Sequence, residues 1–343
     1  MKRDNYIGGS ISTRIYENNL LTRNDLERLN DYNSVEKVLS ALNDSSYKDS
    51  IQALGRPEEY EKILDDELKK TYDLIEQTSD NKDILEYFRE KYNFHNLKVI
   101  AKEIVQKENY VNLYSDIGNI DISYIKKNLL GNTKEKSFLE NVYIEGYEPF
   151  DISSNENDQY LDYVANAIDT FRETNDPKDI DISLDKDYYE KLLKDAKKIG
   201  LEDLETYTKE RIDLINIKAL MRIKAQGGNP DQLNDALIKG GYIDLGDIKD
   251  FYSLDLSQIV EKLSTTRIGK YLTNHFSDND DINENLLNLE KSIDDHQMQY
   301  SKIAKSMTYG PEVLMNYIIS KEAEIKNLRI ILVSKLNSLP KEF

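Results

Sequence analysis

Cysteine and tryptophan are both absent from this 343-residue chain, and it contains no long hydrophobic run. The lack of cysteine excludes disulfide bonds, thiolate metal ligands and a cysteine nucleophile, a pattern typical of a reducing compartment. The longest aliphatic run near the C-terminus, Ile330 to Val333, is far below the roughly 20 apolar residues that a membrane-spanning helix needs. The N-terminal stretch includes Asp4 and Glu17 and lacks the apolar core of a signal peptide. We therefore expect a soluble, cytoplasmic protein that does not insert directly into a bilayer.

Positive charge is also in short supply, because 46 lysines and arginines face 64 aspartates and glutamates. The resulting formal charge of −18 repels phosphate backbones and anionic lipid surfaces. Nucleic acid is therefore excluded as an expected partner. The 24 tyrosines are expected to pack in cores and interfaces rather than to stack on bases.

Motifs for catalysis and for metal binding are missing as well. The histidines at 95, 275 and 296 do not have the spacing of metal ligands, and there is no G-x-x-x-x-G-K-S/T phosphate loop. We expect no catalytic residue, no metal and no cofactor. His95 is expected to serve in packing or to lie at the surface.

The acidic run after Ser277 leaves one enzymatic alternative open. Asp280, Asp281 and Glu284 are spaced like the aspartate-rich magnesium motif of helical prenyl-transfer enzymes, but no comparable motif faces them. As a calcium loop, the run lacks the turn glycine. A solvated loop before a helix is the favoured interpretation, and a magnesium-dependent helical enzyme is the weaker alternative.

What the sequence does contain is helix punctuation. Helices are expected to begin at prolines followed by acidic residues, which favour the positive end of the helix dipole: Pro57, Pro230 and Pro311. Ser183 or Asp185 is expected to cap a further helix that Gly200 ends, and Gly240 is expected to end the Pro230 helix. The segment 242–256 could be misread as a strand, but its apolar residues fit a helical period better. We expect an all-α chain.

One helical pattern occurs three times, centred on Asn96, Asn216 and Asn327. On a helix wheel, the residues four before, three after and four after each asparagine lie within about 60° of it. All of them are apolar: Tyr92, Val99 and Ile100; Ile212, Ala219 and Leu220; Ala323, Ile330 and Ile331. Each amide is therefore expected to lie inside an apolar face, where an unpaired amide costs roughly 1–3 kcal/mol.

Two further polar positions accompany each asparagine. Three residues earlier, on the same helix face, stand Asn93, Asp213 and Glu324. With the asparagines they are expected to tie adjacent helices together. Two residues after each asparagine stands a cation, about 200° away on the wheel: Lys98, Lys218 and Arg329. These cations are expected either to be solvated or to line a shared contact surface.

A longer correspondence supports three homologous units. The stretch DLERLNDYNSVEKVLSALNDSSY from Asp25 resembles DIKDFYSLDLSQIVEKLSTTRIGKY from Asp247, at a similar distance from an asparagine helix. We therefore divide the chain into helical repeats at 1–117, 118–229 and 230–343, each long enough for a small bundle. The polar stretch 131–181 is expected to be partly an insertion or a mobile connection.

The chain resembles a known family along most of its length. YGPEVLMNYIISKEAEIKNLRIILVSKLNSLP at the C-terminus is similar to the terminal signature of the C subunit of archaeal and bacterial V/A-type rotary ATPases, the homologue of the d subunit of eukaryotic V-ATPases. FREKYNFHNLK from Phe88, ERIDLINIKALMRIK from Glu210, SLDKDYYEKLL from Ser183, and the opening Tyr6 to Leu21 with Arg14 also look like that family.

This resemblance implies three helical-bundle domains arranged pseudo-threefold as a funnel. It implies a non-catalytic central-stalk subunit that joins the central shaft subunits to the cytoplasmic face of the membrane rotor ring during ATP-linked H⁺ or Na⁺ transport. Arg14 and the three repeated cations become candidates for partner contact. The choice of ion, and of ATP synthesis or hydrolysis, belongs to other subunits. The alternative from another class is a helical scaffold of an unrelated complex.

Overall fold

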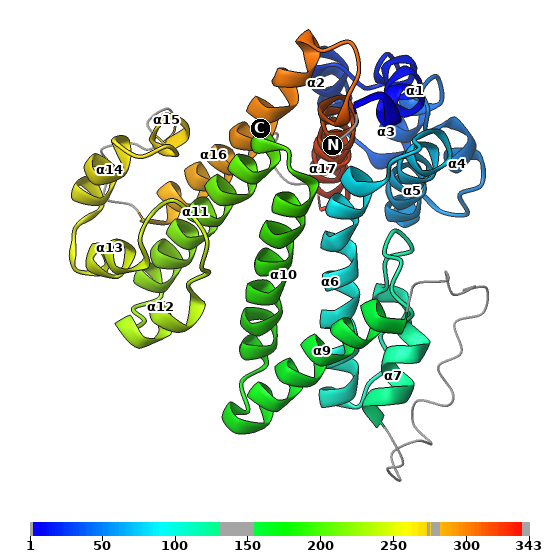
Figure 1. Ribbon diagram of the computed structural model, residues 1–343. Helices are drawn as coiled ribbons and strands as arrows, with labels where there is room; N and C mark the ends of the chain where they lie inside the picture. The colour runs from blue at the N-terminus through cyan, green and yellow to red at the C-terminus, as the bar shows by residue number, and fades with distance from the viewer. Residues whose placement is uncertain (1–2, 131–153, 273–274, 276–281, 338–343) are drawn as a thin grey trace. The chain divides into compact units, whose positions relative to one another are not determined.

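The computed structural model describes residues 3–130, 154–272, 275 and 282–337, and every regular element in these ranges is a helix. The all-α prediction is confirmed for this part of the chain (Figure 1). The chain divides into two compact units, Met1–Glu86 with Gln297–Phe343, and Tyr87–His296. The division into three repeats at 117 and 229 remains a prediction, since the boundaries of these two units fall elsewhere in the sequence, after Glu86 and after His296.

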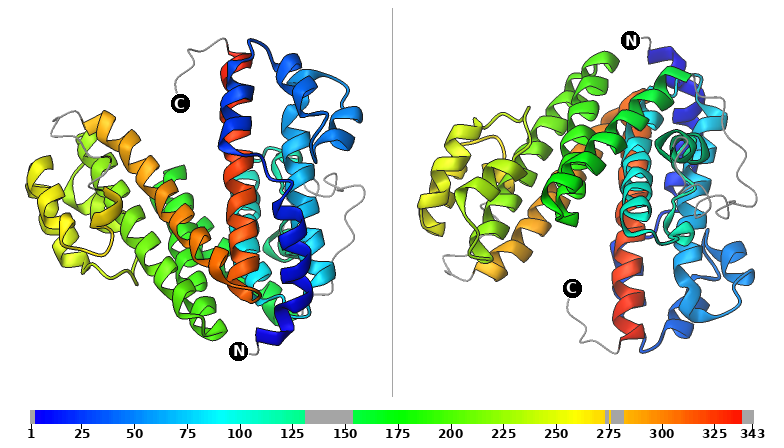
Figure 2. Two further views of the ribbon diagram at one scale, coloured as in Figure 1. Left: turned by 90° about the horizontal axis from the view of Figure 1, so that it is seen from above. Right: turned by 90° about the horizontal axis from the view of Figure 1, so that it is seen from below.

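The first unit combines the two ends of the chain. Its elements are η1 (Arg3–Tyr6), α1 (Ile7–Glu17), α2 (Arg23–Asp31), α3 (Val35–Leu42), α4 (Lys48–Gln52), η2 (Pro57–Glu59), α5 (Tyr60–Thr78), η5 (Ala304–Ser306) and α17 (Pro311–Leu336). The C-terminal helix α17 packs against α1, α2, α3 and α5, so the blue and red segments run side by side (Figure 2). Large side chains of this unit are fully buried, among them Tyr6, Tyr72 and Ile75.

The second unit is a chain of longer helices with shorter ones between them. Its elements are α6 (Asp83–Gln106, which begins in the first unit), η3 (Val111–Leu113), α7 (Ile122–Leu130), α9 (Ser154–Thr174), α10 (Pro177–Ile199), α11 (Glu202–Ala225), α12 (Pro230–Ala236), α13 (Leu245–Asp250), η4 (Phe251–Ser253), α14 (Leu256–Ser264), α15 (Gly269–Leu272) and α16 (Ile282–Ile303, which ends in the first unit). The segment 242–256 is helical apart from short turns, as predicted.

The described residues of the second unit include two hydrophobic cores. One is built on α6, α7, α9 and α10, and includes Phe94, Ile100 and Val164. The other is built on α11 to α16, and includes Leu214, Leu220 and Ile293. Each core therefore contains one of the repeated asparagine helices, α6 or α11, together with the helices that follow it in sequence.

Helix ends are where the sequence expectations succeed and fail. Pro230 and Pro311 stand at the first positions of α12 and α17, and Pro57 begins the η2 turn that leads into α5. Gly200 ends α10 in the left-handed region with φ 69°. The predicted caps of α10, Ser183 and Asp185, are wrong. The helix begins earlier, at Pro177, because the Asp176 carboxylate already accepts a hydrogen bond from the backbone N–H of Lys178.

Two other expectations need correction. Gly240 does not end the Pro230 helix, which stops at Ala236 because the backbone of Leu237 turns extended. Of the polar stretch expected to be partly an insertion or mobile connection at 131–181, the described part is helical, in Ser154–Thr174 and from Pro177 onward, and Tyr160, Val164 and Ile180 lie in a core. The prediction failed because the many polar residues of this stretch outweighed its helical period of buried apolar residues. Residues 131–153 lie outside the described residues.

Candidate functional site: polar pairs on the repeated helices

The first repeated helix, α6, uses its two polar side chains to bind the loop that follows it. The Asn96 amide donates to the backbone oxygen of Ser115 at 3.0 Å, and Ser115 N–H donates to Asn96 Oδ1 at 2.8 Å. One turn earlier, Asn93 Oδ1 accepts from the backbone N–H of Asn119 at 2.8 Å. Both asparagines are fully buried, with Val99 and Ile100 beside Asn96. We call Asn93 and Asn96 the first loop-binding pair.

The second repeated helix, α11, makes the same contacts with a different loop. Asn216 Nδ2 donates to the backbone oxygen of Ile238, and Ile238 N–H donates back to Oδ1, both at 2.8 Å. The carboxylate of Asp213 accepts from the N–H groups of Tyr242 at 3.0 Å and Ile243 at 3.1 Å. Asp213 and Asn216 are the second loop-binding pair, and both are buried.

The two loops meet their helices in the same register. In both loops, the residue bound by Asn96 or Asn216 lies four positions before the residue bound by the polar side chain one helical turn earlier on the helix. These loop residues are 115 and 119 for the first pair, and 238 and 242 for the second. A glycine stands directly before the second contact each time. A Cβ on Gly118 would lie 2.7 Å from Asn96 Nδ2, and a Cβ on Gly241 would lie 2.0 Å from Asp213 Oδ1. The sequence repeat is thus a repeat of helix-to-loop contacts, for which glycine leaves the space.

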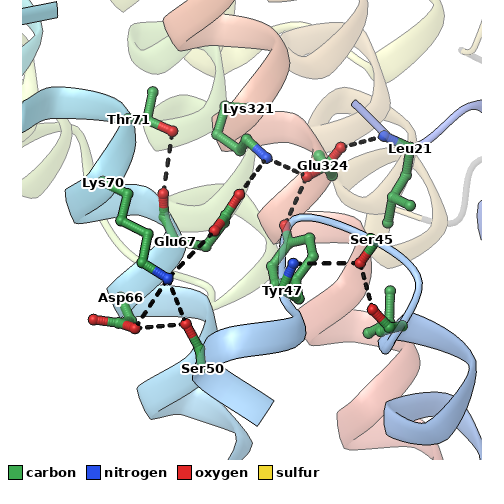
Figure 3. A network of polar contacts seen from close by, with 11 residues as sticks. Leu21, Ser45, Tyr47, Ser50, Asp66, Glu67, Lys70, Thr71, Lys321 and Glu324 are labelled. Atoms are coloured by element: carbon green, nitrogen blue, oxygen red, sulfur yellow. Dashed lines mark hydrogen bonds and ion pairs between the residues drawn. The ribbon is translucent and has the colours of Figure 1, made fainter. Parts of the chain in front are cut away.

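The third repeated helix, α17, finds its loop at the opposite end of the chain. The Glu324 carboxylate accepts from the backbone N–H of Leu21 and from the Tyr47 hydroxyl at 2.6 Å (Figure 3). Leu21 directly precedes Thr22, which caps α2, just as Ile243 precedes Asp244, which caps α13. The N-terminal loop therefore fills for α17 the place that the following loops fill for α6 and α11.

Asn327 does not follow the other two asparagines. It is half-buried, its neighbour Ile330 is 45% exposed, and within the described ranges no hydrogen bond to its amide is seen. The expected burial is therefore wrong for Asn327 and Ile330, although Ile331 of the same apolar frame is buried. The cause lies in the N-terminal segment. By the four-residue register its partner would be near Tyr16, but Tyr16 belongs to α1 and its carbonyl already accepts from Asn19 N–H at 2.9 Å.

A buried ionisable residue lies one helical turn before each of Asn93, Asp213 and Glu324. On α17, Lys321 lies between Glu324 at 2.8 Å and Glu67 of α5 at 3.2 Å, and it is only 2% exposed (Figure 3). Burial alone would lower the pKa of Lys321, but the two carboxylates outweigh it and raise the pKa. The lysine is therefore charged, and it joins α17 to α5.

On α6 the corresponding residue is Glu90. It accepts from the Tyr160 hydroxyl at 2.6 Å and pairs with Lys191 of α10 at 3.2 Å. Burial raises the pKa of Glu90, against the opposing charge of Lys191. This contact joins α6 to α9 and α10 within the second unit.

On α11 the corresponding residue is Glu210, which lies 3.2 Å from His296 Nε2 of α16 and accepts from the Tyr271 hydroxyl at 3.3 Å. Burial lowers the pKa of His296, whose ring stacks on Tyr207 with centroids 5.1 Å apart. In all three helices, then, a charged residue six before the asparagine contacts the long helix that completes its bundle.

The predicted contact cations all have partners inside the chain. Lys98 pairs with Asp185 at 2.7 Å, Lys218 with Glu290, and Arg329 with Glu61 at 2.9 Å. These pairs are at least partly solvated, so each contributes only about 0–1 kcal/mol. Their role in binding another protein stays a prediction.

Arg14 is bound more tightly than these three. It pairs with Glu17 at 2.7 Å and donates to the backbone oxygens of Ala304 and Met307, the latter at 2.8 Å. The guanidinium thereby fixes α1 to the segment before α17. Contact between Arg14 and a partner remains a prediction.

The described residues contain no group of three or more histidines, cysteines and carboxylates placed to hold a metal ion. Asp280 and Asp281 lie outside the described residues, while Glu284 is exposed in α16. His95 is exposed and contacts the Leu113 carbonyl at 2.7 Å, and His275 pairs with Asp295. No described helix combines the length and apolar character required to cross a bilayer. The polar residues of the repeat serve to fix helices and loops in register.

Sequence reasoning missed the loop residues that receive the polar pairs, and it missed the N-terminal loop as the partner of α17. A signal was present for two of them, since Gly118 and Gly241 stand at matching positions before loop contacts. It also missed Lys321 and Glu67, which lie 254 residues apart in sequence. Their opposite charges carry no local sign of pairing.

Comparison with known proteins gives one family. The family model described as "ATP synthase (C/AC39) subunit" matches residues 12–343. The chain is 21% identical over 318 residues to the C subunit of the V-type sodium ATPase of Enterococcus hirae, covering 93% of this chain and 90% of that protein.

Archaeal relatives are similar at the same level. The chain is 26% identical to the C subunit of the A-type ATP synthase of Methanocaldococcus jannaschii, over 92% of this chain and 79% of that protein. It is 22% identical to the protein of the same name from Thermococcus kodakarensis, over 92% and 82% of the two chains.

Proposed function

Because the chain belongs to the ATP synthase (C/AC39) subunit family, we propose that it is the central-stalk subunit that joins the shaft of a V/A-type ATPase to the membrane rotor ring. Membership of the family makes the chain a non-catalytic subunit of such an ATPase. The proposal adds its place in the complex, on the cytoplasmic side between the shaft and the ring. The family match along residues 12–343 is the observation that carries it.

The internal contacts support a mechanical role. A coupling part must transmit torque without letting its helices slip, and a packed interior with paired buried polar groups resists slippage because displacement leaves those groups unpaired. Both loop-binding pairs have this property, since each fixes a loop to a long helix through three or more hydrogen bonds to the loop backbone. The Lys321 contacts fix α17 to α5 in the same way.

The predicted threefold funnel belongs to this proposal as well. An ionisable residue of each repeated helix contacts a long helix: α6 contacts α10, α11 contacts α16, and α17 contacts α5. Three such bundles around an axis would leave a central space for the foot of a shaft. The acidic charge of the chain favours basic surfaces on the shaft or the ring.

Removal and return of this subunit tests the proposal. Membrane vesicles that carry the ATPase without this chain should hydrolyse ATP while transporting no ions, and adding the purified chain should restore transport. Because the contact is expected to be electrostatic in part, restoration should weaken as salt increases. Vesicles that transport ions equally well without the chain would contradict the proposal.

A further inference from the structure

Helix α1 has its most hydrophobic side chains on the outside. Ile7, Ile11 and Ile15 are 40%, 59% and 61% exposed. The face of α1 that is buried within the first unit consists instead of Gly9, Ser10 and Thr13. An ordinary surface helix buries its apolar stripe and exposes its polar one, so α1 is inverted.

Specific contacts hold α1 in this orientation. The Ser10 hydroxyl accepts from the backbone N–H of Gly310 at 3.0 Å, and Arg14 binds the carbonyls of Ala304 and Met307. At the end of the helix, the Glu17 carboxylate accepts from the Asn316 amide. These contacts run along the buried side of α1, which therefore cannot turn its isoleucines inward without breaking them.

Glycine fixes the same orientation through close packing. A Cβ on Gly8 would lie 2.5 Å from the carbonyl oxygen of Thr78, and a Cβ on Gly9 would lie 2.9 Å from Ser79 Cβ. No larger side chain fits where α1 meets the end of α5. The exposed isoleucines thus follow from the way the helix is seated.

The isoleucines form a ridge that suits another helix. Residues four apart lie on one helix face about 6 Å from each other, so the three side chains make a row roughly 12 Å long. Rows of this kind pack into the grooves of a second helix at an axial distance of about 8–10 Å, which is the ordinary spacing of packed helices.

The charges around the ridge favour a protein over a lipid surface. Helices that lie on membranes carry free lysines and arginines beside their apolar face. On α1 and the preceding turn, Arg3 pairs with Glu312 at 2.7 Å and Arg14 pairs with Glu17 at 2.7 Å. Asp4, three residues before Ile7, is exposed, and the chain as a whole carries a formal charge of −18. An anionic membrane would be repelled, whereas a helix with basic flanks would be attracted.

We propose that Ile7, Ile11 and Ile15 are the docking ridge for an α-helix of another subunit of the same ATPase, one with an apolar face flanked by lysine or arginine. The inference requires that the chain is a subunit of an ATPase. It does not require the central-stalk position, so the two can fail separately.

A photoreactive side chain at position 11 of the assembled, membrane-bound ATPase identifies the occupant. The expected result is an adduct with a helical segment of another subunit, located by mass spectrometry. An adduct with lipid, an adduct with a second copy of this chain, or capture by solvent alone would overturn the inference. An adduct with a stationary subunit would sustain it while contradicting the central-stalk position.

A second measurement uses Ile7→Ser, Ile11→Ser and Ile15→Ser together. Because these side chains are 40–61% exposed and form no part of the buried core, the melting temperature of the purified chain should stay nearly unchanged. Titrated onto the ATPase from which the native chain was removed, the variant should bind on the order of 100-fold more weakly, because three apolar contacts are lost. Undiminished binding would overturn the inference. Should the variant melt early, the photoadduct at position 11 decides alone.

A matched control lies on α16 in the other unit. Leu287 is 67% exposed, more than any of the three isoleucines, and its change to serine removes as much apolar surface at one site. Leu287→Ser should bind nearly as tightly as the native chain. Its single-site counterpart on the ridge is Ile11→Ser. A loss of binding in Leu287→Ser as large as in Ile11→Ser would show that exposed apolar area alone, and not the ridge, governs binding, which would overturn the inference.

Discussion

The side-chain amides of Asn96 and Asn216 pair with the loop backbone as a neighbouring β-strand would. Each amide both donates a hydrogen bond to one loop residue and accepts one from it. A buried backbone N–H and carbonyl are thereby satisfied together. Among the residues that the structure describes, none binds the Asn327 side chain in this way, because the corresponding backbone belongs to helix α1. One residue type at one repeat position therefore has two different structural roles.

Substitution by leucine should separate these roles. Asn96→Leu and Asn216→Leu each leave a buried N–H and carbonyl unpaired, and each should lower the free energy of unfolding by about 2–4 kcal/mol. Asn327→Leu serves as the matched control and should change it by less than about 1 kcal/mol. Denaturant titration of the three variants checks this. Equal losses at all three positions would contradict the distinction.

Asp213 should make stability depend on pH. Burial raises the pKa of its carboxyl from near 3.8 to about 6, although the N–H groups of Ile243 and Tyr242 oppose the shift. A raised pKa means that the folded state holds the proton more tightly, so its contribution is complete below about pH 4 and is lost as the pH rises through 6. Compared with Asp213→Asn, the native chain should lose roughly 2–3 kcal/mol between pH 4 and pH 7.

The control for this experiment is a carboxylate with the opposite shift. Asp255 caps α14, and the backbone N–H of Gln258 and the Ser257 hydroxyl lower its pKa. Relative to Asp255→Asn, the native chain should lose stability as the pH falls below about 4. If the free energy of unfolding of the native protein, relative to that of Asp213→Asn, stayed constant or rose from pH 4 to pH 7, the assigned pKa shift would be contradicted.

Loops after α6 and α11 are held close to their helices because glycine precedes the bound residue. Gly118→Ala and Gly241→Ala would place a methyl group within 2.7 Å and 2.0 Å of the loop-binding pairs. Each should cost about 1–3 kcal/mol. Hydrogen exchange should show lost protection at Asn119 N–H in the first variant and at Tyr242 N–H in the second.

Gly55→Ala is the matched control for these glycines. The nearest atom to a Cβ at Gly55 is a flexible carboxylate oxygen at 3.9 Å, so this variant should be close to neutral. Loop amides that stay protected in Gly118→Ala and Gly241→Ala would show that the contacts yield without cost, which would contradict the account of a fixed register.

Most of the helices could be predicted from the sequence, because prolines, acidic caps and apolar periods act locally. Pro230, Pro311 and Gly200 mark ends that the structure confirms. The polar repeat could be found as well, and for Asn96 and Asn216 so could its burial. The hydrogen-bond partners of the repeated polar residues could not be predicted. Ser115, Ile238 and Leu21 contribute only backbone atoms, which every residue type has. The exposure of the isoleucines of α1 could not be predicted either, since the orientation of this helix depends on tertiary contacts.

The first unit is held together by contacts between the N-terminal and C-terminal parts of the chain. Glu67 and Leu21 from the N-terminal part meet Lys321 and Glu324 of α17, so the first unit forms only when residues separated by 254 or more positions come together. Such contacts cost more loop entropy than local ones. The two ends should therefore gain and lose their structure together.

Lys321→Met tests this closure. The variant removes the cation between two buried carboxylates and should lower the stability of the first unit by about 3–5 kcal/mol. Hydrogen exchange should then increase in both α17 and α5, while the cores of the second unit keep most of their protection. Loss confined to α17 would contradict the closure of the two ends into one unit.

A map of the intact complex shows whether this subunit occupies the proposed place in the ATPase. We expect density for this chain on the rotation axis, between the shaft and the membrane ring, with α1 covered by a helix of another subunit. Density on the periphery of the complex, away from the axis, would contradict it.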